Sequence, residues 1–157
     1  MRAGIFSIYS ELHDQKRIQV SEELLTRILR EKMPVELIKN RDFNGYDLIF
    51  IAVFSGGCEK RLVETWPDIE STKASVAIIA FENNNSLPAA LEIKTWLLQR
   101  KESEKIPILH GPVERIADQC FELFDNLVSP NILRRDNIGL IGRPSDWLIG
   151  SMPQPEI

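Results

Sequence analysis

The sequence has few of the residues that mark a secreted, metal-binding or membrane protein. It contains two cysteines, Cys58 and Cys120, and two histidines, His13 and His110. Neither pair has the spacing of a disulfide framework or a zinc site, so we expect reduced thiols and no metal site in this stretch. No apolar run approaches the ~18 residues that span a bilayer, and no export signal opens the chain. We therefore expect a cytoplasmic protein with no membrane partner.

A strong excess of charge of one sign is also lacking. The chain has 19 Lys and Arg residues against 23 Asp and Glu residues, for a net charge of −4. Its basic residues are scattered along the sequence, whereas a nucleic-acid-binding surface needs a dense basic patch or stripe. We therefore expect no nucleic-acid partner.

The common nucleotide-binding and flavin-binding motifs are missing. There is no G-x-G-x-x-G after the first apolar run and no G-x-x-x-x-G-K-[ST] in the chain. The first predicted loop, Ser10 to Gln15, has no glycine and so does not resemble a flavin phosphate cradle. It also lacks the paired acidic residues of a phosphoacceptor receiver domain. These absences argue against flavodoxin, receiver and nucleotide-binding functions.

The chain does contain a regular alternation of short apolar runs and segments of helical periodicity. The apolar runs show little period-two alternation, which is typical of strands buried on both faces. They are Ala3 to Tyr9, Val35 to Ile38, Leu48 to Phe54, Val76 to Phe81 and Ile106 to Leu109. The helical segments are Ser21 to Lys32, roughly Cys58 to Thr65, Leu87 to Lys101 and Val113 to Val128. We expect the second helix to end at Trp66, before Pro67.

This pattern predicts an α/β fold, a doubly wound three-layer parallel sheet of the flavodoxin-like or Rossmann-like type, with strand order 2-1-3-4-5. Residues 1–130 are predicted to form this domain, and the polar run 131–137 is typical of a linker. Ile138 to Ile141 resembles a sixth strand that opens a second, truncated domain at 138–157. We therefore expect the chain to be the N-terminal piece of a longer protein.

Ligands of such sheets bind beyond the carboxyl ends of the strands, so the loops there are the candidate site. The third strand is followed by Ser55, Gly56, Gly57 and Cys58. Glycines let a backbone approach a ligand closely, although a tight turn needs them equally. Cys58 at a helix N-terminus favours a lowered thiol pKa. A phosphatase-like Cys-x5-Arg motif, however, would need arginine where Glu64 stands.

The fourth strand is followed by three consecutive asparagines. Asn85 or Ser86 is a natural N-cap for the next helix, and Pro88 suits its first turn. Capping explains one of these side chains, while neutral amides such as that of Asn84 also suit the hydroxyls of a sugar or polyol. His110, after the fifth strand, is either a pocket donor or an ordinary turn histidine.

Three segments together resemble one family. They are VFSGGCE (Val53 to Glu59), NNSLPAALE (Asn84 to Glu92) and GLIGRPSDWLIGS, which lies within Ile138 to Ser151. In this order and spacing they are similar to the N-terminal region of the L-fucose isomerase-like and L-arabinose isomerase-like proteins. Cys58 departs from the pattern, which usually has threonine there.

The resemblance implies an oligomeric, three-domain aldose–ketose isomerase that uses manganese or a similar divalent ion. It places the metal ligands and the acid–base pair in the later domains of the chain, so no catalytic residue and no cofactor are expected in this segment. The loop positions and the resemblance together give these candidates for lining a substrate pocket: Ser55, Gly56, Gly57, Asn84, Asn85, Ser86, His110, Arg143, Ser145 and Trp147.

The leading hypothesis is therefore a non-catalytic N-terminal domain that contributes to a sugar pocket and to a homo-oligomer. Its partners would be the remaining domains of its own chain, further copies of that chain, and a sugar or polyol. Two alternatives from other classes stay open: a stand-alone module that binds a small polar ligand, and an assembly domain that binds none.

Overall fold

The computed structural model describes residues 1–100 and 106–128. Within them, five strands and four helices follow one another along the chain, alternating except between the second and third strands, which no helix separates. The strands are β1 (Ala3–Ile8), β2 (Val35–Leu37), β3 (Leu48–Val53), β4 (Ser75–Ala80) and β5 (Ile108–His110). The helices are α1 (Gln15–Lys32), α2 (Glu59–Ser71), α3 (Ser86–Leu98) and α4 (Val113–Val128). All strand pairs are parallel, in the order β2-β1-β3-β4-β5, which confirms the predicted fold class and strand order.

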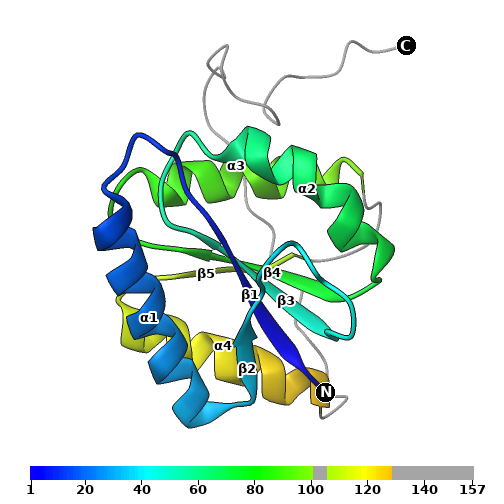
Figure 1. The fold of residues 1–157 in the computed structure, drawn as a ribbon. Coiled ribbons are helices and arrows are strands. Elements are labelled where there is room, and N and C mark those ends of the chain that lie inside the picture. Colours follow the sequence, from blue (N-terminus) through cyan, green and yellow to red (C-terminus); the bar gives the residue numbers. More distant parts are fainter. Residues whose placement is uncertain (101–105, 129–157) are drawn as a thin grey trace.

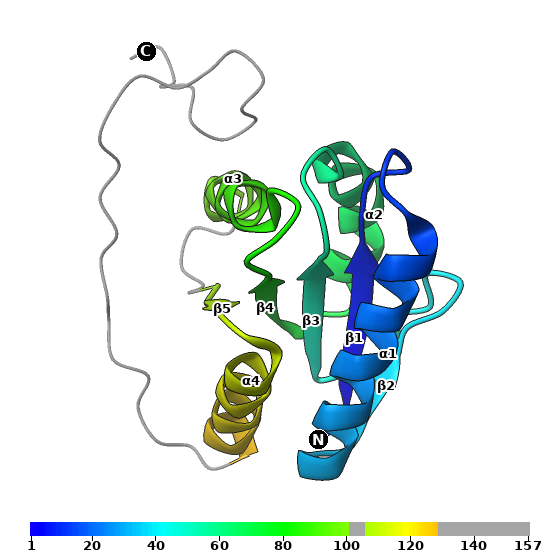
Figure 2. The same cartoon turned by 90° about the vertical axis from the view of Figure 1, so that its left-hand side faces the viewer.

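The sheet lies between two helical layers (Figure 1). Helices α1 and α4 cover one face, and α2 and α3 cover the other. Successive strand residues point to opposite faces. Ile5 and Phe50 therefore belong to the core under α1 and α4, while Phe6 and Ile51 belong to the core under α2 and α3. Figure 2 shows α3 and α4 on opposite sides of β5.

The connection from β2 to β3 contains no helix. Residues 38–47 form turns, a bend and irregular backbone, and Phe43 lies fully buried. Its ring meets Phe6 edge to face, with ring centroids 5.0 Å apart. This aromatic pair anchors the loop beside the end of β1, where one of the cavities described below lies.

Helix α1 begins earlier than the apolar stripe from Ser21 predicts. Asp14 is its N-cap, and its carboxylate accepts a hydrogen bond from the backbone N–H of Lys16 at 3.0 Å. The first turn is polar and exposed, so it carries no hydrophobic periodicity that a sequence pattern would detect. Because the helix begins at Gln15, Arg17 lies on a helix rather than in a loop.

Helix α2 does not end before Pro67, and that prediction was wrong. The helix continues to Ser71 with Pro67 inside it. An internal proline removes one helical hydrogen bond and costs about 3 kcal/mol. Trp66 and Ile69, on either side of it, are 2% and 1% exposed, and their burial offsets that loss.

The remaining boundaries differ from the predicted ones by small shifts. Strand β5 occupies Ile108–His110 rather than Ile106 to Leu109, and α3 ends at Leu98. The predicted linker at 131–137 and the predicted second domain at 138–157 lie outside the described residues, so that division stays a prediction. None of the helices described here is long and apolar enough to cross a membrane.

Candidate functional site

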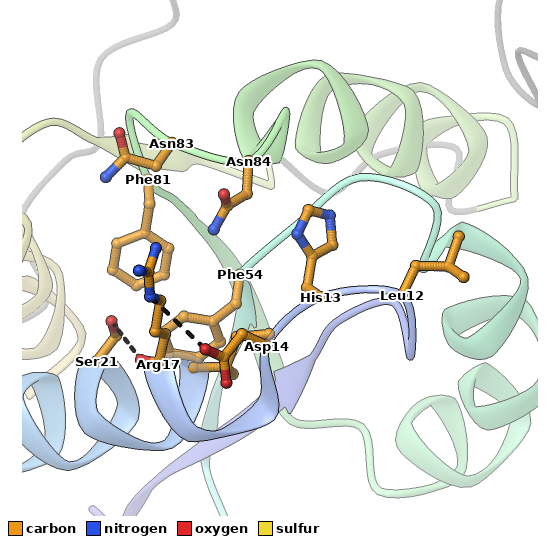
Figure 3. A pocket seen from close by; sticks show the side chains of 10 residues that line it. Leu12, His13, Asp14, Arg17, Ser21, Phe54, Phe81, Asn83 and Asn84 are labelled. Carbon is orange, nitrogen blue, oxygen red and sulfur yellow. Dashed lines mark hydrogen bonds and ion pairs between the residues drawn. The ribbon is translucent and has the colours of Figure 1, made fainter.

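A cavity of about 310 Å³ opens at the carboxyl edge of the sheet, between α1 and the loop that follows β4 (Figure 3). This is the edge at which ligands of doubly wound sheets bind, and the volume lies at the lower end of the range usual for small-molecule pockets. Its lining combines two aromatic rings with polar side chains from two loops and one helix: Leu12, His13, Asp14, Arg17, Ile18, Ser21, Phe54, Phe81, Asn83 and Asn84.

Two stacked phenylalanines form the apolar part of the cavity. Phe54 follows β3 and Phe81 follows β4, and their ring centroids are 4.6 Å apart with an interplanar angle of 16°. Phe54 is buried, whereas Phe81 is partly exposed toward the cavity. The stack offers an apolar surface to the carbon skeleton of a ligand.

Polar side chains enter the same space from opposite sides. His13 and Asp14 come from the loop before α1, Arg17 comes from the first turn of α1, and Asn83 and Asn84 come from the β4–α3 loop (Figure 3). The Arg17 guanidinium lies 3.6 Å from an Asp14 carboxylate oxygen. Both residues are well exposed, so the pair is weak and its groups are available to a ligand.

Backbone conformation explains two of the three consecutive asparagines. Asn84 and Asn85 have φ of 58° and 55°, in the left-handed region that asparagine tolerates better than most residues. Asn85 is the N-cap residue of α3, which confirms one of the two predicted positions, but its side chain makes no capping hydrogen bond. Only Asn84 of this pair lines the cavity.

Ser55, Gly56 and Ser86 join the loops of the carboxyl edge to one another. The Ser55 hydroxyl accepts a hydrogen bond from the backbone N–H of Ser10 at 2.9 Å, and the N–H of Gly56 donates to the carbonyl oxygen of Asn84 at 2.8 Å. The Ser86 hydroxyl donates to a backbone carbonyl of β3 and accepts from the loop after β4. Ser55 and Ser86 are fully buried. These three predicted site residues therefore shape the cavity without lining it.

Gly57 and Cys58 also lie outside the cavity lining. Gly57 has a φ of 77°, which accounts for its glycine as a turn residue. Cys58 is buried, and burial raises the pKa of its thiol to about 12, so the expected lowering was wrong. Its thiol donates to the carbonyl oxygen of Ser55 at 3.0 Å, which is a packing role rather than that of a nucleophile.

His110 is tied to the sheet rather than directed into the cavity. Its Nδ1 lies 3.0 Å from the carbonyl oxygen of Ala80, and its backbone N–H donates to the Gln119 side chain at 3.1 Å. A carbonyl only accepts, so Nδ1 carries the proton of this bond. The neighbouring Gly111 lines a smaller hollow of about 170 Å³ that shares Phe81 and Asn83 with the first cavity.

Of the candidates predicted from the sequence, the structure places Asn84 at the cavity, while Arg143, Ser145 and Trp147 lie outside the described residues. The sequence reasoning missed most of the lining. The apolar pattern places Phe54 and Phe81 at the ends of buried strands, and no neighbouring pattern gives His13 a role. One sequence signal could have identified Arg17. Asp14 is a good N-cap residue, and Arg17 follows it by about one helical turn, which places Arg17 at the start of a helix on this edge of the sheet.

The described residues do not fit a manganese site. Across 1–100 and 106–128, no three His, Cys, Asp or Glu side chains are grouped closely enough to hold a metal ion. Cavity residues Asp14 and His13 supply one carboxylate and one imidazole, fewer than a divalent ion needs from a protein.

Comparison with protein-family models, with curated proteins and with solved structures finds no match to this chain.

Proposed function

We propose that this chain is a non-catalytic N-terminal domain of a sugar-isomerase-like protein, which holds a sugar or polyol at the carboxyl edge of its sheet. The single observation that carries the proposal is the 310 Å³ cavity between α1 and the β4–α3 loop. It combines an apolar wall with amide, guanidinium, imidazole and carboxylate groups, and sugars present both apolar C–H faces and hydroxyls.

The polar groups around the cavity suit neutral hydroxyls. The Asn83 and Asn84 amides each donate and accept, so they can pair with a hydroxyl in either direction. Arg17 donates only and Asp14 accepts only, and the weak ion pair between them exchanges readily for ligand contacts. The stacked pair Phe54 and Phe81 gives the sugar ring a surface to pack on.

The resemblance to isomerase-like proteins adds the wider context of the proposal. Under it, the metal ion and the acid–base groups come from later domains, and this domain contributes binding contacts and a surface for assembly. Transfer of the proton is accordingly assigned to none of the cavity residues.

The test is a ligand titration of the 157-residue chain with a panel of aldoses, ketoses and polyols, followed by thermal unfolding and by amide NMR shifts. A ligand at 100 times its Kd adds about 2.7 kcal/mol to the unfolding free energy. We expect at least one sugar to raise Tm and to shift the amide signals of Arg17 and Asn84. A panel without any such effect would contradict binding at this cavity.

Two matched variants locate the binding. Asn84→Gly and Asn85→Gly each replace an asparagine in the left-handed region with a residue that accepts it, but only Asn84 lines the cavity. We expect Asn84→Gly to weaken sugar binding and Asn85→Gly to leave it nearly unchanged. Equal effects of the two variants would place the ligand elsewhere.

The alternative functions, a stand-alone binding module and an assembly domain, predict different experimental results. The mass of the natural gene product decides between a domain of a larger protein, well above 18.0 kDa, and a stand-alone binding module near 18.0 kDa. An assembly domain would instead give a stable oligomer by light scattering and no response to any sugar.

A further inference from the structure

A second cavity, of about 300 Å³, lies on the other side of α1 from the first. It forms where β2 stops, because the pairing of β1 with β2 ends at Ile5 and Leu37 while β1 continues to Ile8. The neighbouring helical residues Ser21 and Glu22 line the first and second cavity respectively, and the two linings share no residue. The second cavity is therefore separate from the proposed sugar site.

Three cationic side chains from two separate segments line this second cavity. Lys39 and Arg41 come from the loop after β2, and Arg61 comes from α2. Within 1–100 and 106–128, none of the three forms an ion pair. The Arg61 guanidinium lies 5.3 Å from the centroid of the Tyr9 ring, which holds it beside the cavity. Glu22 is the one carboxylate among the lining residues, so the cavity carries an excess of positive charge.

A further lining residue, Ser7, has a hydroxyl without a hydrogen-bond partner among the described residues. The Ser7 Oγ is also buried. Ser7 is in β1 and lines the cavity, in the stretch beyond the pairing with β2. A buried polar atom without a protein partner is uncommon in folded proteins, and a bound ligand can satisfy it.

The loop that carries two of the cations has an unusual backbone. Asn40 and Arg41 have φ of 54° and 55°, two consecutive residues in the left-handed region. Asparagine tolerates this conformation, but arginine has no such local preference. Arg41 is therefore kept in a strained position from which its side chain lines the cavity.

We propose that this second cavity binds the phosphate group of a small molecule. A phosphate presents up to two negative charges and several acceptor oxygens, which match the cationic groups of Lys39, Arg41 and Arg61. The buried hydroxyl of Ser7, another lining residue, is a further donor without a protein partner among the described residues. The guanidinium groups suit its bidentate geometry. The hollow is too small for a folded partner, and the net charge of −4 opposes a nucleic acid, so the ligand is a phosphorylated metabolite or inorganic phosphate.

The test is a titration of the 157-residue chain with inorganic phosphate at constant ionic strength, with chloride as the balancing anion. Amide NMR shifts of Ser7 and Asn40 report the binding. We expect saturable shifts with phosphate and none with chloride. A parallel titration with glycerol 3-phosphate separates the sources: tighter binding indicates a phosphate monoester, and equal binding indicates inorganic phosphate as the ligand.

Charge variants identify the residues involved. Arg61→Gln and Lys39→Gln are each expected to weaken phosphate binding roughly tenfold, because each removes a charge-assisted contact. The control is Lys60→Gln, which removes the same charge from an exposed neighbour of Arg61 outside the lining. It is expected to change binding less than about twofold, since its charge lies outside the lining and salt screens such a charge.

One variant is expected to increase the affinity for phosphate, a result that a folding defect cannot produce. Glu22→Gln removes the carboxylate of the lining and is expected to tighten phosphate binding roughly two- to fivefold. The proposal is overturned if phosphate shifts do not saturate, if chloride gives the same shifts, or if Glu22→Gln weakens binding. It is also overturned if Lys60→Gln weakens binding as much as Arg61→Gln does. None of these results depends on whether the first cavity binds a sugar.

Discussion

The backbone N–H of Gly56 donates a hydrogen bond to the carbonyl oxygen of Asn84 at 2.8 Å. This bond joins the loop after β3 to the loop after β4. The Ser55 hydroxyl extends the connection to the loop after β1 through the N–H of Ser10. The three loops that surround the first cavity are thus linked by hydrogen bonds that do not depend on a ligand.

Gly56→Ala is expected to destabilise the fold by about 1–2 kcal/mol. A Cβ at this position would lie 3.1 Å from the Cβ of Asn85 and 3.2 Å from its carbonyl oxygen. The backbone oxygen has no freedom to rotate away, so the loop must shift. Urea unfolding followed by circular dichroism measures the change.

The control for this prediction is Gly57→Asn. Gly57 has a positive φ that asparagine tolerates, and an added Cβ would meet Ser10 at an ordinary 3.6 Å. We expect a loss of about 1 kcal/mol or less. A larger loss here than in Gly56→Ala would contradict the close approach to Asn85 as the main constraint.

Ser86→Ala is expected to destabilise the fold by about 2–4 kcal/mol. The hydroxyl donates to the carbonyl oxygen of Val53 and accepts from the N–H of Phe81 at 2.8 Å, and Ser86 is fully buried. Alanine would leave both backbone groups without this partner. Thermal or urea unfolding tests the change, with Ser71→Ala at an exposed helix end as the control, expected within about 0.5 kcal/mol of the parent chain.

Stability is expected to fall as pH rises above 9. Burial raises the pKa of Cys58 from 9.0 to about 12, and burial also raises the pKa of Cys120. Between pH 9 and 12 the unfolded chain loses thiol protons that the native chain keeps, so alkaline conditions favour unfolding. Each thiol contributes a slope of about 1.4 kcal/mol per pH unit in that interval.

Cys58→Ala provides the comparison, because it removes one of the two titrating thiols. Its unfolding free energy should decline less steeply above pH 9 than that of the parent chain. In the parent chain at pH 8, both thiols should also react slowly with a thiol reagent until urea is added. Equal slopes in the two chains would show that Cys58 does not keep its proton.

Arg41→Gly is expected to stabilise the fold by about 1 kcal/mol while weakening phosphate binding. Arg41 has a φ of 55°, and glycine adopts that backbone without strain. The comparison is Asn40→Gly, in which the replaced residue already tolerates its φ of 54°, so little change is expected. Unfolding curves and the phosphate titration together separate the two effects.

Much of the fold could be predicted because its strands are buried on both faces. Leu48–Val53 is buried at every position, and such a run has few alternatives to a central parallel strand. The errors lie where local signals compete with tertiary packing. Pro67 normally stops a helix, but the burial of Trp66 and Ile69 keeps α2 continuous past it.

The candidate site was harder to predict, because its residues come from distant parts of the chain. Asn84 was identified from its position after a strand. Arg17 and Phe54 meet around the same cavity only after the crossover helix α1 has returned along the sheet. The left-handed backbone of Asn84 and Asn85 is a second case, since asparagine favours that conformation without requiring it.

The hydrogen bonds from Gly56, Ser55 and Ser86 also bear on how fast a ligand is captured at the first cavity. Loops that are already joined to each other lose little conformational freedom when a ligand enters. Association is then a single encounter step whose observed rate rises linearly with ligand concentration, with no slower closing phase behind it. Differences in affinity among ligands of this cavity would accordingly arise from differences in their dissociation rates.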